Sequence, residues 1–207
     1  MNGSHECRNI ARAGHTGDRR VVEAGLATDD PRARVVAIGA AVRLDLLDVE
    51  RLVGFLDDDS HDVRYRALEV LPKLVDRADA ADAVITRLAD PDLAELAAFT
   101  LGEIDPRGEA RDRSIDALRR QAMGHEDALC RESAVAALGA LGAGLDAILA
   151  ACGDIATVRR RAVLALAPFE GPEVDAALTR ALEDRDWQVR QAAEDLLSVE
   201  SDGNSGD

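Results

Sequence analysis

The chain repeats a short apolar pattern at intervals of about thirty residues. Residues 63–71, 158–166 and 189–197 align as V-R-x-x-A-x-x-φ-L, where φ is apolar and x varies, and weaker copies begin at residues 33, 94 and 130. The arginine of the pattern corresponds to Arg34, Arg64, Glu95, Arg131, Arg159 and Arg190. Self-similarity at this period predicts a stack of like units, because one unit cannot bury its apolar faces alone.

Each repeat is expected to contain two helices. In residues 63–71 the apolar positions recur at i, i+4, i+7 and i+8, which places them on one helical face. A second amphipathic stretch precedes this one, as in residues 49–56, and the acidic turn 57–60 joins the two. Aspartate and serine accept hydrogen bonds from the first N–H groups of a helix, so such turns specify where the second helix begins. The sequence therefore predicts an all-α protein.

The motif resembles the short HEAT repeats of the phycobilisome-lyase type, over roughly residues 5–198. The resemblance and the period together imply a right-handed α-solenoid of about six two-helix repeats, with a degenerate N-terminal cap at residues 7–11. We expect one repeat domain over residues 1–198 and a disordered acidic tail over residues 199–207, which lack apolar periodicity. The expected repeats are approximately 17–44, 46–75, 79–104, 107–142, 144–168 and 171–198.

The charge composition disfavours several kinds of partner. Against 40 acidic residues the chain has 25 basic ones, a formal net charge of −15 at pH 7. Such a chain repels nucleic acid and anionic membranes, so we expect no nucleic-acid partner. Lys73 is the only lysine, and scarce lysine with surplus acid resembles the cytosolic proteins of haloarchaea. No apolar run is long enough to span a bilayer, and we expect a cytoplasmic protein without membrane insertion.

No catalytic, cofactor or metal signature accompanies the repeats. The four histidines are scattered, and neither a phosphate-binding loop nor a nucleophile elbow occurs. Cys7, Cys130 and Cys152 lack metal-ligand spacing, and the first two fall at a core position of the repeat. The acidic run 57–59 lacks the glycine and distal glutamate of a calcium loop, so we interpret it as a helix cap. We expect no enzyme activity, metal or cofactor.

The recurring arginines are interpreted as structural, each placed to reach the carboxylates or carbonyls of a neighbouring turn.

The residue two positions after the valine of each motif points away from the core, and the second helices of HEAT-like stacks line the concave face. Three of these residues are apolar and, with a nearby phenylalanine, predict an exposed strip for a partner, unless a neighbouring repeat covers it. Arginines further along add a positive patch. The predicted partner-binding residues are Val35, Tyr65, Arg66, Leu96, Phe99, Arg160 and Arg161.

These features favour a non-enzymatic scaffold or adaptor that binds another protein. The resemblance extends to small HEAT-type adaptors that accompany haloarchaeal taxis genes, which implies a link between taxis signalling proteins and the archaellum motor. The alternative that the family implies is a bilin lyase subunit or lyase-like chaperone. It would need a tetrapyrrole site, and an aromatic content of 2% argues against one.

The net charge of −15 predicts that folding depends on salt. At low ionic strength the carboxylates repel one another within the compact state, and salt screens this repulsion. Thermal melting followed by circular dichroism should therefore show Tm rising as salt approaches molar concentration. A Tm that stays constant from low to high salt would contradict the inferred haloarchaeal origin.

Overall fold

The computed structural model describes residues 3–203, and side chains as far as Ser198. Among these residues every regular element is a helix, which confirms the predicted all-α class. The chain forms two compact units, Met1–Thr86 and Arg87–Asp207. The α-helices are α1 (Gly3–Thr16), α2 (Arg19–Leu26), α3 (Pro31–Arg43), α4 (Val49–Gly54), α5 (His61–Val70), α6 (Ala81–Arg87), α7 (Ala94–Ile104), α8 (Gly108–Gly124), α9 (Ala128–Ala140), α10 (Leu145–Ala151), α11 (Ala156–Ala165), α12 (Pro172–Leu182) and α13 (Trp187–Gly203).

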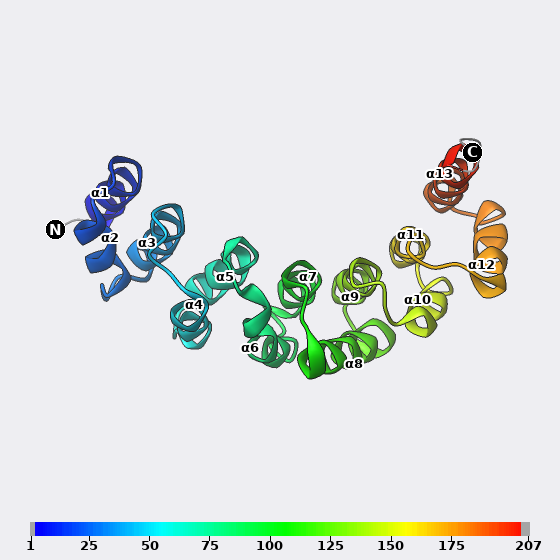
Figure 1. Ribbon diagram of the computed structural model, residues 1–207, viewed down its shortest axis with the longest axis horizontal. Coiled ribbons are helices and arrows are strands. Elements are labelled where there is room, and N and C mark those ends of the chain that lie inside the picture. Colours follow the sequence, from blue (N-terminus) through cyan, green and yellow to red (C-terminus); the bar gives the residue numbers. More distant parts are fainter. Residues whose placement is uncertain (1–2, 204–207) are drawn as a thin grey trace. The chain divides into compact units, whose positions relative to one another are not determined.

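In the first unit, α1, α3 and α5 lie side by side in one layer. Helix α3 packs against both of the others, and α2 packs against α1 and α3 from the second layer, to which α4 also belongs (Figure 1). Three short 3₁₀ helices connect the later elements, at Phe55–Asp57, Leu71–Lys73 and Arg77–Ala80. Ile38, Leu52 and Leu68 are fully buried and form part of this core.

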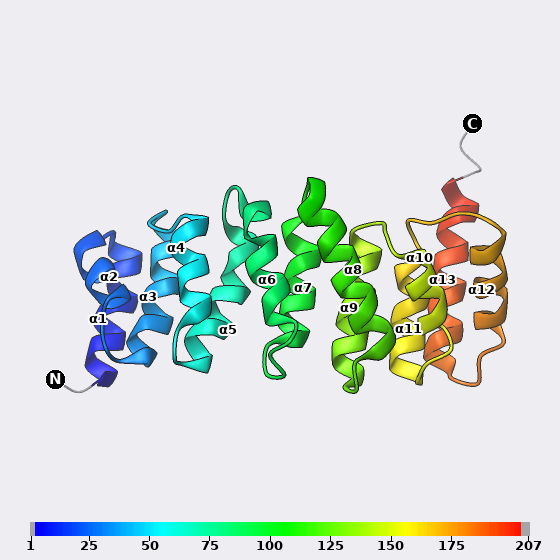
Figure 2. The ribbon, with the colours of Figure 1, turned by 90° about the horizontal axis from the view of Figure 1, so that it is seen from below.

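In the second unit, α7, α9, α11 and α13 are successive neighbours in one layer, and α8, α10 and α12 form the other (Figures 1 and 2). The pairs α8–α9 and α10–α11 fall within the expected repeats 107–142 and 144–168, and the pair α12–α13 begins within the expected repeat 171–198 and continues to Gly203. The longest step between motifs predicts a lengthened first helix, and α8, with 17 residues, confirms it.

Alanine rather than aromatic side chains lets the layers approach. The alanine four residues after the first position of each motif is fully buried in both units, as the pattern predicts. Alanine keeps the helix axes close and loses no side-chain entropy on burial. These alanines are Ala37, Ala67, Ala98, Ala134, Ala162 and Ala193.

Two features differ from the sequence expectation. The expected domain over residues 1–198 forms two compact units that meet after Thr86, within the seven-residue helix α6 and within the expected repeat 79–104. The disordered tail was expected from residue 199, but α13 continues to Gly203. Extending an established helix adds one hydrogen bond for each residue fixed, which favours this continuation over residues 199–203. Residues 204–207 of the expected tail lie outside the described residues.

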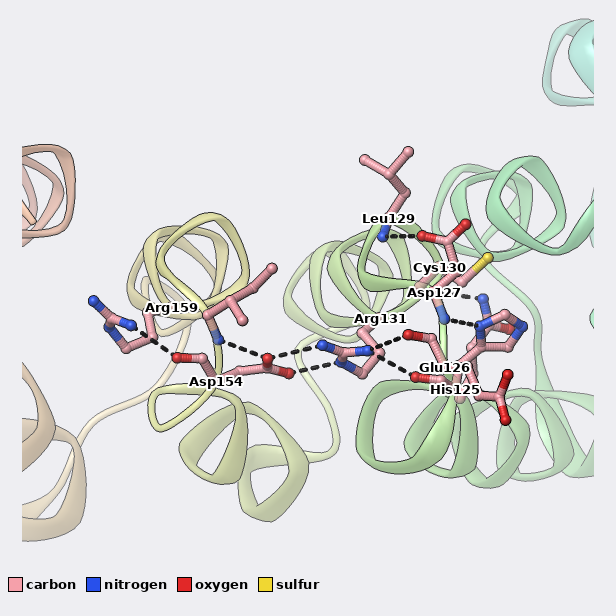
Figure 3. A network of polar contacts seen from close by, with 10 residues as sticks. His125, Glu126, Asp127, Leu129, Cys130, Arg131, Asp154 and Arg159 are labelled. Atoms are coloured by element: carbon pink, nitrogen blue, oxygen red, sulfur yellow. Dashed lines mark hydrogen bonds and ion pairs between the residues drawn. The ribbon is translucent and has the colours of Figure 1, made fainter.

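An arginine–aspartate ladder joins the turns of successive helix pairs (Figure 3). Arg131 donates from Nη1 to the carbonyl oxygens of His125 (2.8 Å) and Glu126 (2.9 Å) in its own turn. Its Nε and Nη2 bind the two oxygens of Asp154 at 2.7 and 2.9 Å. The planar guanidinium thus satisfies orphan carbonyls and pairs bidentately with the next turn.

The same arrangement recurs along the chain. Arg159 donates to the Asp154 carbonyl at 2.8 Å and binds both oxygens of Asp184 at 2.7 and 2.8 Å. In the first unit, Arg34 donates to the Thr28 carbonyl (2.9 Å) and to Asp58 Oδ1 (2.7 Å). Arg64 and Arg190 donate to the Asp58 and Asp184 carbonyls at 2.9 and 2.7 Å. These contacts confirm the structural interpretation of the recurring arginines.

The ladder makes stability depend on acid pH. The hydrogen bond from Arg131 lowers the pKa of Asp154, and the bond from Arg159 lowers the pKa of Asp184. A carboxyl whose pKa is lower in the folded chain than in the unfolded chain stabilises the fold above its unfolded pKa of about 3.9. That contribution is lost as the pH falls through the lower, folded pKa.

We therefore expect Asp154→Asn to lower the free energy of unfolding at pH 7 by about 1–3 kcal/mol, because a half-buried charged hydrogen-bond network is broken. The variant should also lose less stability than the parent between pH 5 and pH 3. Urea unfolding at constant salt measures both effects. Glu23→Gln is the matched control, because its pair with Arg51 is exposed and should contribute at most about 1 kcal/mol. Equal acid sensitivity of Asp154→Asn and the parent would contradict the ladder's role.

Candidate partner-binding groove

An open groove of about 530 Å³ lies between α3 and α5 in the first unit. Both helices present residues at i, i+3, i+4 and i+7 spacings, which form one face of each helix. Helix α3 begins where the sequence specifies, since Asp30 Oδ1 accepts the Arg32 N–H at 3.0 Å and Pro31 occupies the first turn. The groove is lined by Arg32, Val35, Val36, Gly39 and Arg43 of α3 and by Asp62, Tyr65, Arg66 and Glu69 of α5.

Apolar side chains contribute much of the groove's surface. Val35 and Val36 are half-buried on α3, and Tyr65 is 44% exposed on α5. The ring of His61 lies beside the Tyr65 ring, with centroids 6.0 Å apart. An aromatic ring that keeps this much surface in water, next to half-buried valines, offers apolar area for burial by a partner.

Arg66 lies across the groove because Gly39 leaves room for it. A Cβ atom at position 39 would overlap Nη2 of Arg66, so the guanidinium rests against the backbone of α3. Nη1 of Arg66 pairs with Glu69 at 2.6 Å, whereas its Nε is buried without a hydrogen-bond acceptor. Arg66 therefore retains a donor that its own neighbours do not satisfy.

The arginines outnumber the carboxylates at this groove, although the whole chain is strongly acidic. Among the described residues, the side chains of Arg32 and Arg43 make no hydrogen bond or ion pair, and both are exposed. Asp62 lies beside the His61 ring, with Nδ1 at 3.4 Å from Oδ1. Two unpaired guanidinium groups beside an apolar surface favour a ligand that has both carboxylate and apolar groups.

Three predicted site residues, Val35, Tyr65 and Arg66, therefore line one groove. Leu96 and Phe99 lie on α7 in the second unit; Phe99 is 52% exposed, as expected, whereas Leu96 is half-buried. Five further lining residues were not predicted from the sequence, although the helical period could have found them, since each lies one or two turns from a predicted residue or beside one. They are Arg32, Gly39, Arg43, Asp62 and Glu69.

The predicted positive patch is smaller than expected. Arg161 pairs with Glu132 of α9 at 3.2 Å, so a neighbouring helix neutralises it. Glu132 occupies on α9 the position that Tyr65 occupies on α5, and the helical wheel of one repeat does not show such pairing between repeats. Arg160 is exposed and has no side-chain partner in the described part of the chain.

Cys130 and Cys152 do not have the properties of catalytic thiols. Burial raises the pKa of Cys130, which is 3% exposed, and raises the pKa of Cys152 to about 11. Nucleophilic cysteines need a lowered pKa, because the thiolate is the reactive form. Within residues 3–203, no group of histidine, cysteine and carboxylate side chains has the arrangement of a metal site. No helix in this range combines the length and apolarity needed to cross a membrane.

Neither a family model nor a curated protein matches this chain. Among solved structures, the chain is similar to an engineered protein whose crystal structure was determined by the Northeast Structural Genomics Consortium. The TM-score is 0.60 at 18% sequence identity, and the alignment covers 92% of this chain and 95% of the engineered one. At this identity the similarity concerns the fold alone.

Replacement by alanine should change stability differently at Gly39 of α3 and at Gly139 of α9. In Gly39→Ala the new Cβ meets the flexible end of Arg66, so we expect unchanged or slightly higher stability, because alanine favours a helix by about 0.5–1 kcal/mol. In Gly139→Ala the new Cβ would lie 2.8 Å from the Ala165 Cα, so two packed helices must separate. We expect that change to cost about 1–3 kcal/mol.

Urea unfolding of the two variants measures this difference directly. If Gly39→Ala is as destabilising as Gly139→Ala, then Arg66 is fixed in place and does not lie freely across the groove.

Proposed function

We propose that the protein is a non-enzymatic adaptor that binds another protein through the groove between α3 and α5. The observation that carries this proposal is the combination of an exposed tyrosine, half-buried valines and arginines without internal partners on one open surface. A partner segment that buries Tyr65 and presents carboxylates to Arg32 and Arg43 would satisfy both features. Aromatic and arginine residues are the side chains that most often dominate binding energy at protein interfaces.

The finer architecture belongs to the same proposal. Successive helix pairs at the expected repeat positions support a right-handed α-solenoid of about six HEAT-like repeats, with α1 as the N-terminal cap. In such proteins the second helix of each pair lines the binding face, and α3 and α5 are second helices. Leu96, Phe99 and Arg160 belong to the proposed binding residues as well, on second helices of the other unit.

The assignment of this adaptor to taxis signalling rests on the resemblance to haloarchaeal HEAT-type adaptors alone. In a haloarchaeon, the adaptor would connect taxis signalling proteins to the archaellum motor in the cytoplasm. Neighbouring taxis or archaellum genes would support this assignment. The bilin-lyase alternative can be tested directly. If it holds, mixing purified protein with bilin shifts the visible absorbance of the bilin, and we expect no shift.

Mutation of the groove tests the binding proposal. We expect Tyr65→Ala to weaken partner binding by about 1–3 kcal/mol, a 5- to 150-fold loss, while Tm stays nearly unchanged because the ring is exposed. Arg43→Glu should chiefly slow association and weaken its salt dependence, because exposed charges steer encounter more than they hold the complex. Affinity capture of the partner from native lysate, followed by titration of the identified partner, measures both effects.

Val75→Ala is the control, since Val75 is 80% exposed and lies outside the groove. It should change neither binding nor Tm. Leu96→Ala, Phe99→Ala and Arg160→Glu test the proposed binding residues of the second unit by the same measurement. Full partner binding by a Tyr65→Ala/Arg43→Glu double variant that melts like the parent would refute the groove as the docking site.

A further inference from the structure

The wall that α3 contributes to the groove of the first unit has an arginine at each end. Arg32 lies in the first turn of α3, and Arg43 is the last residue of this helix. With 3.6 residues per turn, their separation of eleven residues is just over three turns, so both lie on one face of α3, about 16 Å apart along its axis. Val35, Val36 and Gly39 line the wall between them.

Neither of these arginines belongs to the pattern of the repeat. The ladder arginines recur at one position of the motif and bind the neighbouring turns, whereas the positions of Arg32 and Arg43 vary in charge and size. Counted from the first residue of each motif, the counterparts of Arg32 in α5, α9 and α11 are Asp62, Leu129 and Thr157, and those of Arg43 are Lys73, Ala140 and Pro168. The stacking of repeats therefore does not require an arginine at either place.

The carboxylates of the opposite wall leave both arginines without a partner. On α5, Glu69 pairs with Arg66 at 2.6 Å, and Asp62 lies beside the ring of His61. Among the described residues, the side chains of Arg32 and Arg43 make no hydrogen bond or ion pair, and both are exposed. Each end of the wall therefore offers a guanidinium group to carboxylates of a ligand.

The two walls offer side chains and few free backbone groups. Residues 32–43 and 62–69 lie in regular helices, whose backbone N–H and C=O groups pair within the helix except in the first and last turns. A bound segment in extended conformation would bring backbone groups that these walls cannot satisfy, whereas a helix has already paired its own. A helix also presents side chains every three or four residues, which is the spacing of both walls.

We propose that the groove binds an amphipathic helix of the partner that has two carboxylates eleven residues apart on one face and apolar side chains between them. This inference rests on the proposed function and adds the shape and charge of the bound segment. The helix lies along α3, so that its carboxylates reach Arg32 and Arg43 and its apolar side chains cover Tyr65 and the valines. A guanidinium group at each end sets the register, because a carboxylate on another face would point away from its arginine.

The corresponding face in the second unit does not offer the same contacts. Glu132 of α9 takes the place of Tyr65 and pairs with Arg161 of α11 at 3.2 Å. On these two helices an acidic segment meets one exposed arginine without a side-chain partner among the described residues, Arg160, and no second one three turns away. The acidic helix is therefore assigned to the groove of the first unit.

The test uses three synthetic peptides with a fluorescent label. The matched peptide has eighteen residues, mostly alanine and glutamine, with glutamates at the third and fourteenth positions and leucines at the sixth, seventh and tenth, so that all five lie on one helical face. The displaced peptide has the same composition, but its second glutamate is at the twelfth position, on the opposite face. The extended peptide has its glutamates five residues apart with a proline between them, which spans a similar distance without a helix.

Fluorescence anisotropy at constant salt measures the affinity of each peptide. We expect the matched peptide to bind at least about tenfold more tightly than the displaced one, because only the matched peptide pairs with both arginines. The far-UV difference spectrum should show that it becomes more helical on binding.

Reversal of one charge tests the pairing directly. Arg43→Glu should weaken binding of the matched peptide by about tenfold, and a peptide with lysine in place of one glutamate should recover most of this loss. Arg43→Gln, which removes the charge without reversing it, should lose less and retain the Tm of the parent. Arg20→Glu is the matched control, since Arg20 is exposed on α2 outside the groove and the charge changes equally. It should leave binding nearly unchanged.

Two results would overturn the helix proposal. Equal affinity of the matched and displaced peptides would show that the groove does not recognise the spacing of the carboxylates. Tighter binding of the extended peptide would show that the groove takes an extended segment.

The proposed function fails by a different result. If Tyr65→Ala weakens capture of the native partner while the matched peptide does not bind, the helix is rejected and the adaptor groove stands. If the Tyr65→Ala/Arg43→Glu double variant captures the native partner fully, the adaptor groove itself is rejected.

Discussion

The pairing of the recurring arginines with aspartates and carbonyl oxygens of neighbouring turns is the interaction on which the rest of the structure depends. Every helix pair brings together the carbonyl end of one helix and the N–H end of the next, and these groups need partners. Arg131 and Arg159 supply several donors each to their own turn and to the following turn. The same contact therefore satisfies backbone groups and sets the spacing between repeats.

The core matches this arrangement because it is built from small side chains. Buried alanines such as Ala67 and Ala162 allow helices to lie close together, and Gly139 allows a close approach to Ala165. The core also buries leucine and isoleucine side chains, but no aromatic side chain of the described residues is fully buried in it. The directional Arg–Asp contacts add specificity, and they stabilise the fold only while the aspartates are ionised.

The proposed binding groove has an electrostatic property that sets it apart. In a chain with 40 acidic residues, most arginines of the ladder are satisfied internally, whereas Arg32 and Arg43 at the groove lack carboxylate partners among the described residues. Each lies beside exposed aromatic or aliphatic surface. Selective binding follows from this contrast, because an acidic surface repels most anionic proteins and leaves only a few places where carboxylates are attracted.

The sequence by itself determined the helix pairs, the buried alanines, the structural arginines and the outward direction of Val35 and Tyr65. All of these follow from the helical period within one repeat, which is a local property. Only the tertiary structure decided that Arg161 is neutralised by Glu132 and that Gly39 makes room for Arg66. Those outcomes depend on which side chains of different repeats meet, and a helical wheel drawn for one repeat carries no information about its neighbour.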